Sequence, residues 1–237
     1  MRHVKYTIEQ ARKIVLNCAK LYRSRLLNRN LLIIYRDRSD HTLHDIEITF
    51  YERNYQHLTG LELVDAQGHV IRGQSVNFYR KCAENRLSTK EIRFRADGTA
   101  QLKLTALPFL MDLTKITRIA GDYNWRQPYL KVDKVLGGVN FCLGLSRSGG
   151  TYVPSSALLK DIKKLSDNTS QVLAILEKNC SEKFYTKLRY TARGVDFSSL
   201  CLPDEIAAGI LLPDSEHTVK KDEEKRTGLL FEDEESS

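Results

Sequence analysis

The sequence predicts an α+β protein, with an N-terminal helix packed on a curved, mainly antiparallel sheet and additional short helices. Apolar residues recur every three or four positions between Ile8 and Leu26, which is typical of an amphipathic helix. Short runs that alternate polar and apolar residues follow, and glycine-containing turns separate several of them. We expect a single domain over residues 1–212.

The composition is that of a globular protein. The chain has 237 residues, of which 41% are hydrophobic and 28% charged, enough to bury a substantial core. Nothing approaches the roughly eighteen consecutive apolar residues of a membrane span, and charged residues occupy the N-terminus instead of an apolar signal core. These features predict a cytoplasmic protein with no membrane partner.

Metal and cofactor motifs are missing from the sequence. The five cysteines are widely spread and never form a C-x-x-C pair, which argues against a zinc site or a disulfide framework. Glycine-rich phosphate loops are absent, and the close pair His41 and His44 has no carboxylate motif to complete a metal site. We therefore expect no metal and no cofactor.

Charge is divided unevenly along the chain. The net charge is +7, yet residues 213–237 hold nine acidic and four basic residues, so this segment carries −5 and the rest +12. The segment is expected to be a disordered tail with one short apolar island, Leu229 to Phe231. The basic body fits a polyanion partner, although basic residues also serve solubility, and composition alone leaves both open.

The first part of the chain predicts a helix and two strands. Residues 7–27 form the helix, with Thr7 and Gln10 as a capping box. Residues 31–35 are apolar enough for a buried strand, and residues 45–51 alternate as a half-buried strand. We expect this second strand to continue to Gly60, which would place His57 near the rim of the sheet.

Later elements follow from local patterns. A helix is predicted over 75–85 with Ser75 as its cap, and Ser88 caps a further short turn. Asp97-Gly98 predicts a hairpin between residues 92–95 and 100–104. The remaining predictions are helices over 107–113 and 157–165, strands over 116–123, 130–135, 139–145, 151–153 and 171–177, and a last short helix near Phe184 and Leu188.

The residues that remain suit metal-independent cleavage of RNA. This reaction needs a base for the 2′-hydroxyl proton, an acid for the leaving oxygen and positive charge for the phosphorane. His57 can fill either proton-transfer role, and which one stays open. Lys90, Arg93 and Arg95 can supply charge, Thr59 and Tyr79 can donate hydrogen bonds to phosphate, and Arg93, Arg95 and Lys103 would form a cationic face for nucleic acid. By itself, a single histidine in a strand is more often structural.

Several short motifs also carry a family resemblance. These are His57-Leu58-Thr59-Gly60, the stretch 76–79 with 87–88 after it, the turn at Asp97-Gly98 running into 102–104, and the stretches 141–145 and 152–156. Together they resemble a phage-associated group, the fourth, of the barnase–EndoU–colicin–RelE-like nucleases. The resemblance spans roughly residues 6–200.

The resemblance implies a helix-plus-curved-sheet fold and metal-independent ribonuclease activity. It also implies a toxin or mobile-element setting, in which RNA, with tRNA as one candidate, is the substrate and an antitoxin or immunity protein is a candidate partner. His57 and Thr59 are the main residues it carries over to this chain, Tyr79 and Lys90 are weaker transfers, and Arg93 and Arg95 rest on charge alone.

Two other functions stay open. The chain could be a non-catalytic RNA- or protein-binding module on the same fold, with the acidic tail covering its basic face. An ADP-ribosyl- or phosphotransferase is a third reading, for which the accompanying Tyr and Glu constellation is not visible.

Overall fold

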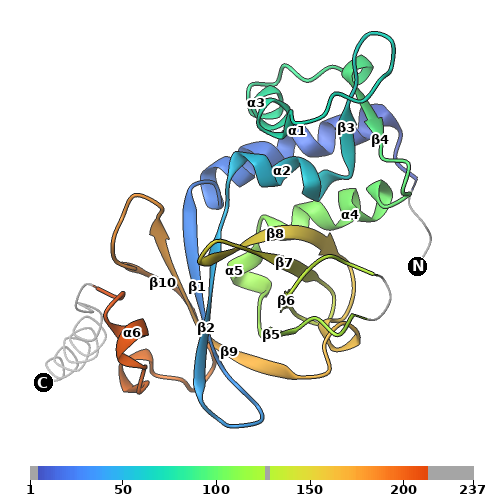
Figure 1. Cartoon of the computed structure of the whole chain (residues 1–237). Coiled ribbons are helices and arrows are strands. Elements are labelled where there is room, and N and C mark those ends of the chain that lie inside the picture. The colour runs from blue at the N-terminus through green and yellow to red at the C-terminus, as the bar shows by residue number, and fades with distance from the viewer. Residues whose placement is uncertain (1–4, 126–128, 213–237) are drawn as a thin grey trace, which may run out of the picture.

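A computed structural model of the chain describes residues 5–125 and 129–212, and it has the predicted α+β architecture (Figure 1). The α-helices are α1 (Ile8–Arg25), α2 (Glu52–Thr59), α3 (Ser75–Ala83), α4 (Ala100–Leu110), α5 (Leu113–Ile116) and α6 (Asp204–Ala207). Short 3-10 helices are η1 (Thr89–Glu91), η2 (Ile162–Lys164) and η3 (Phe197–Ser199). The strands are β1 (Arg29–Arg36), β2 (Leu43–Thr49), β3 (Leu61–Leu63), β4 (Ile92–Phe94), β5 (Ile119–Asp122), β6 (Lys134–Gly137), β7 (Cys142–Ser148), β8 (Thr151–Leu158), β9 (Thr169–Asn179) and β10 (Lys187–Thr191).

The main sheet curves and closes on itself, with β10 as an additional strand beside β9. Its order is β1-β2-β8-β7-β6-β5-β9-β10, and β9 also pairs with β1. Every pairing is antiparallel except that between β2 and β8, which confirms the mainly antiparallel prediction. Residues 31–35 of β1 form a continuous buried run because both faces of the strand are covered. Leu31, Ile33 and Tyr35 lie in the main core, whereas Leu32 and Ile34 lie in a second apolar cluster.

Helices α1 to α4 and the small sheet of β3 and β4 lie together at one end of the main sheet (Figure 1). Helix α1 begins as predicted, because Thr7 Oγ1 accepts from Gln10 N at 3.3 Å and Gln10 Oε1 accepts from Thr7 N at 2.9 Å. Helices α2 and α4 both contact β8. The main hydrophobic core lies between these helices and the sheet.

The expected strand around His57 is wrong, because residues 52–59 form helix α2. Strand β2 ends at Thr49, and Asn54 Oδ1 then accepts a hydrogen bond from Tyr51 N at 3.0 Å at the start of the helix. The buried residues of α2 are Asn54, Tyr55, Leu58 and Thr59, a helical and not an alternating spacing. Gly60 ends the helix in the left-handed conformation, with φ of 71°.

The expected hairpin around Asp97-Gly98 is also wrong. Strand β4 pairs with β3, not with the residues that follow it. After the turn, Asp97 Oδ1 accepts hydrogen bonds from Thr99 N at 3.0 Å and Thr99 Oγ1 at 2.7 Å, and α4 begins directly afterwards. The helix predicted over 107–113 thus starts earlier than expected and includes Pro108.

Two later predictions need correction because strands pair where helices were expected, and the predicted cap at Ser75 is also wrong. The helix expected over 157–165 is wrong because β8 runs on to Leu158, paired with Cys142 of β7, and only η2 follows. The helix expected near Phe184 and Leu188 is wrong because β10 pairs there with β9. At Ser75, helix α3 starts one residue after its cap position, Gln74, which makes no side-chain capping bond. The hairpin of β7 and β8 and the long strand β9 are confirmed.

The predicted acidic tail, residues 213–237, lies outside the described residues. None of the helices in the described ranges has the length and apolarity needed to cross a membrane.

We predict that Gly60→Ala destabilises the fold more than Gly68→Ala. Both glycines have positive φ, 71° and 84°, which strains any residue with a Cβ by about 1–2 kcal/mol. A Cβ at Gly60 would also lie 2.5 Å from the Ala100 backbone, whereas nothing lies within 4 Å of one at Gly68. Urea unfolding of the two variants beside wild type measures the difference, and equal losses of stability would contradict tight packing of α2 on α4.

Candidate active site

Helix α2 holds His57 on the surface while its opposite face is buried. Tyr55 is 0% exposed, and its hydroxyl donates a hydrogen bond to Val15 O of α1 at 2.6 Å. Leu58 is buried beside it. His57 follows Tyr55 by two positions, about 200° around the helix, so its imidazole points away from the core.

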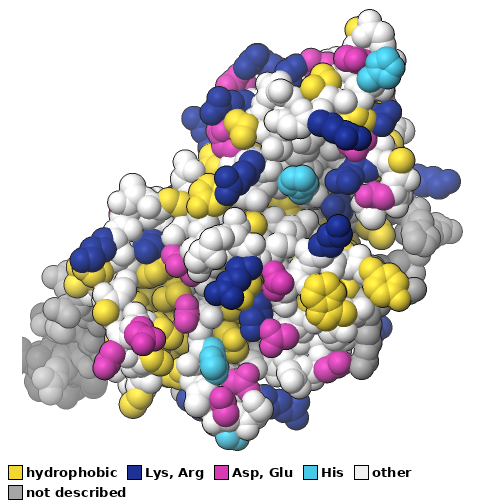
Figure 2. Space-filling view, in the orientation of Figure 1, with side chains coloured by type: hydrophobic (Ala, Val, Ile, Leu, Met, Phe, Trp, Pro, Cys, Tyr) yellow, Lys and Arg dark blue, Asp and Glu magenta, His cyan; other side chains and the backbone are white. Residues whose placement is uncertain are grey.

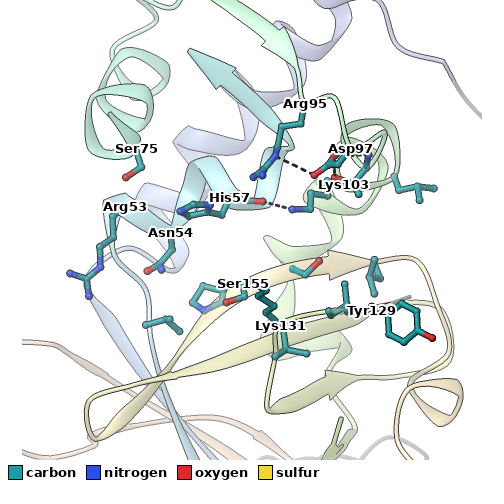
Figure 3. Close-up of a pocket in the computed structure, with 18 residues that line it drawn as sticks. Arg53, Asn54, His57, Ser75, Arg95, Asp97, Lys103, Tyr129, Lys131 and Ser155 are labelled. Atoms are coloured by element: carbon teal, nitrogen blue, oxygen red, sulfur yellow. Dashed lines mark hydrogen bonds and ion pairs between the residues drawn. The ribbon is translucent and has the colours of Figure 1, made fainter. Parts of the chain in front are cut away.

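Two cations from a distant part of the chain lie beside this histidine (Figure 3). Lys103 of α4 donates a hydrogen bond from Nζ to His57 O at 2.8 Å, near the negative end of α2. Arg95 follows β4, and its backbone N donates to Gly60 O at 3.0 Å. Arg95 Nε lies 3.3 Å from Asp97 Oδ2, so one carboxylate accompanies the two cations.

These surroundings lower the pKa of His57. Partial burial of the imidazole is the largest cause, and the positive charges of Lys103 and Arg95 add to it. Lys103 itself has a lowered pKa, because of burial and the charge of Arg95, with Asp97 opposing the change. A histidine with a pKa below its usual value is neutral at pH 7 and therefore suited to accept a proton.

His57 lines a pocket of about 700 Å³ that lies between two walls. One wall comes from the helical end of the molecule and the other from β8 and the segment that precedes β6 (Figure 3). In the orientation of Figure 1, Figure 2 shows a histidine with Lys and Arg side chains on several sides of it. The helical wall contains Arg53, Asn54, His57, Ser75, Arg95, Asp97, Thr99, Leu102 and Lys103, and the sheet wall contains Tyr129, Leu130, Lys131, Val132, Val153, Pro154, Ser155, Ser156 and Leu158.

The structure thus brings together three of the predicted residues, His57, Arg95 and Lys103. Arg93 does not line this pocket. It lies on β4 with Nε 3.3 Å from Glu62 Oε2, and its guanidinium also donates to Gly68 O. Lys90 is exposed in η1 and is likewise not part of the lining.

The two predicted hydroxyl donors are buried. Thr59 is 0% exposed, and its Oγ1 donates to Gln56 O at 2.8 Å and accepts from Leu61 N at 3.1 Å, so it helps to end α2. Tyr79 is 2% exposed, with its ring 5.4 Å from that of Tyr55. This geometry gives both side chains structural roles, and any direct part in catalysis stays a prediction.

Some pocket residues escaped the sequence analysis. Arg53 and Asn54 precede His57 by four and three positions, a spacing that places them near it once the segment is recognised as a helix. No local signal identifies Tyr129, Lys131 or Ser155, because they reach the pocket only through folding of the sheet.

Comparison with known protein families identifies the family to which the chain belongs. Residues 14–194 match the family described as phage-Barnase-EndoU-ColicinE5/D-RelE like nuclease 4. The chain belongs to this nuclease family. The match covers most of the chain and includes every residue of the pocket. No curated protein and no solved structure matches the chain significantly.

The pocket of this nuclease contains one carboxylate, Asp97, which is held ionised. Burial raises the pKa of Asp97, but the hydrogen bonds from Thr99 and the charges of Arg95 and Lys103 together lower this pKa by more. The pKa of Asp97 is therefore below its usual value. Across residues 5–125 and 129–212, no three His, Cys, Asp or Glu side chains gather in a group suited to a metal ion.

Tyr79→Phe is expected to leave nuclease activity unchanged and to keep or raise stability. The Tyr79 hydroxyl is buried without a hydrogen-bond partner among the described residues, and burial raises the pKa of Tyr79 to about 12. Removing an unpaired buried hydroxyl relieves a desolvation cost of about 1–3 kcal/mol. Thermal unfolding and RNA cleavage measure the two effects, and a large loss of cleavage by a stably folded variant would restore Tyr79 to the catalytic set.

Proposed function

We propose that this protein is a ribonuclease that cleaves RNA by metal-independent acid–base transphosphorylation. The observation that carries the proposal is His57, with a lowered pKa, beside Arg95 and Lys103 at the wall of an open pocket. Membership of a nuclease family supports the reaction class. The choice of RNA rests on its 2′-hydroxyl, an internal nucleophile that a histidine base can deprotonate without a metal ion.

In the proposed reaction, neutral His57 takes the proton from a ribose 2′-hydroxyl. The 2′-oxygen then attacks phosphorus, the bond from phosphorus to the 5′-oxygen breaks, and the leaving oxygen takes a proton. The products are a 2′,3′-cyclic phosphate and a 5′-hydroxyl. The sequence left the role of His57 open between base and acid, and the lowered pKa of His57 supports the role of base.

The two cations have separate duties in this scheme. Arg95 remains charged throughout and stabilises the negative charge that develops on the phosphorane. Lys103 has a lowered pKa, so its ammonium gives up a proton more readily than an ordinary lysine and is the best-suited donor to the leaving oxygen. Asp97 orients Arg95 through their ion pair.

The partners in this proposal are RNA, with tRNA as one candidate, and an antitoxin or immunity protein. The pocket supports the first through its cations. The second stays a prediction from the family resemblance.

His57→Ala should reduce RNA cleavage about 10²- to 10⁴-fold, the usual contribution of a general base. The assay is cleavage of total tRNA and of unstructured RNA in EDTA, with the product ends analysed for cyclic phosphate. His69→Ala is the matched control, because the His69 side chain is 79% exposed and lies outside the pocket. Retained cleavage by His57→Ala would remove this residue from the mechanism, and RNA binding without cleavage by wild type would favour a binding module.

Arg95→Ala should shift the acidic limb of the pH profile of kcat/KM to higher pH. The charge of Arg95 lowers the pKa of His57, so removing it raises that pKa. A base with a higher pKa is already protonated at a higher pH, and activity is therefore lost earlier as the pH falls. Arg86→Ala is the control, because Arg86 is exposed and paired with Glu84 elsewhere. An unchanged limb in Arg95→Ala would contradict His57 as the titrating base.

A further inference from the structure

The wall opposite His57 begins with an exposed aromatic side chain, Tyr129. Tyr129 is 79% exposed, and it makes no hydrogen bond or ring contact with any described residue. The segment that carries it is nevertheless tied down, because Leu130 N donates a hydrogen bond to Tyr123 Oη at 3.1 Å and Val132 is buried. An exposed aromatic ring on an anchored backbone can serve as a contact surface for a ligand when further apolar groups adjoin it.

Other apolar groups continue this surface into the pocket. Leu102 is 53% exposed on α4, next in the chain to Lys103, and Val153 and Pro154 lie on β8. Figure 3 places Tyr129 and Lys103 toward the same end of the pocket, with Arg53 at the other. Figure 2 shows large hydrophobic side chains on the surface beside the cations.

We propose that Tyr129 is the stacking platform for a nucleobase that adjoins the scissile phosphate. This inference rests on the proposed ribonuclease function and adds a base subsite to it. Arg95 and Lys103 hold the phosphate, while the ring of Tyr129 and the side chain of Leu102 cover one face of the base. The volume of about 700 Å³ lies within the range of roughly 300–1,000 Å³ that small-ligand pockets occupy.

The subsite selects single-stranded RNA. In a duplex, both faces of an internal base are covered by neighbouring base pairs, so an aromatic side chain cannot stack there without unstacking the helix. Loops, ends and unpaired strands expose these faces. Stacking is tolerant of sequence because every base has a π-face, so the subsite selects exposed bases and not a particular base.

The test measures binding to a short single-stranded oligonucleotide with 2′-O-methyl groups, which removes the nucleophile and separates binding from cleavage. Tyr129→Leu keeps an apolar side chain and removes the ring, and it should weaken binding about tenfold, within the range for one stacked base. Tyr129→Phe should bind like wild type. Phe109→Leu is the matched control, because Phe109 is 46% exposed on α4 and does not line the pocket.

A second probe isolates the base itself. Wild type and Tyr129→Leu should bind an abasic version of the oligonucleotide equally, and wild type should prefer the single strand to its duplex. With cleavable RNA, Tyr129→Leu should raise KM with little change in kcat. Equal binding of the intact single strand by wild type and Tyr129→Leu would overturn the subsite.

The outcomes also separate this inference from the proposed function. Ring-dependent binding without cleavage by wild type would leave the base subsite standing and remove the ribonuclease proposal. Cleavage that depends on His57 but not on the ring of Tyr129 would do the reverse. Failure of wild type to bind any RNA probe would overturn both.

Discussion

The buried tyrosine of α2 is the constraint on which the site depends. Tyr55 packs against Tyr22 of α1 and Tyr79 of α3, with ring centroids 5.0 and 5.4 Å away, and its hydroxyl bonds to Val15 O. Rotation of α2 about its axis would expose the ring of Tyr55 and break the hydrogen bond from its hydroxyl to the buried carbonyl of Val15. The orientation of His57 therefore follows from the packing of Tyr55, although the two side chains lie on opposite faces of α2.

The end of α2 is fixed equally closely to the start of α4. Gly60 has no Cβ, which lets its backbone approach Ala100 more closely than any other residue allows. This approach places Lys103, one turn into α4, within hydrogen-bonding distance of the carbonyl of His57. A histidine and a lysine separated by 46 positions thus become neighbours through one glycine contact.

Positive charge is concentrated at this junction. Arg95 and Lys103 lie close enough for the charge of Arg95 to lower the pKa of Lys103, while Asp97 supplies one compensating carboxylate. The two positive charges repel each other at this short range. An incoming phosphate would relieve the repulsion, which is the physical reason that the arrangement suits a substrate of this charge.

Local patterns in the sequence were sufficient for the N-terminal helix, the buried strand β1, the hairpin of β7 and β8, and the overall α+β class, because each depends on periodicity or on a turn signal within a few residues. The shorter elements depend on tertiary contacts that no local pattern shows. Helix α2 spans only two turns, and its sequence follows a strand whose polar and apolar residues alternate, so the local pattern favours a continuation of that strand. The burial of Tyr55 and Leu58, three positions apart, shows the helical spacing. Strand β4 pairs with β3, about thirty residues earlier in the chain, and not with residues 100–104. Residues 100–104 are therefore not needed as a partner strand and form the start of α4.

The site divides in the same way. The sequence by itself determined the chemical types, a histidine with lysines and arginines, and it named His57, Arg95 and Lys103 among the candidates. Only the tertiary structure decided that these three meet, that Thr59 and Tyr79 are buried, and that Tyr129 and Lys131 form the opposite wall. The physical reason is that the pocket is assembled by contacts between helices and a closed sheet, and those contacts leave no periodic trace along the chain.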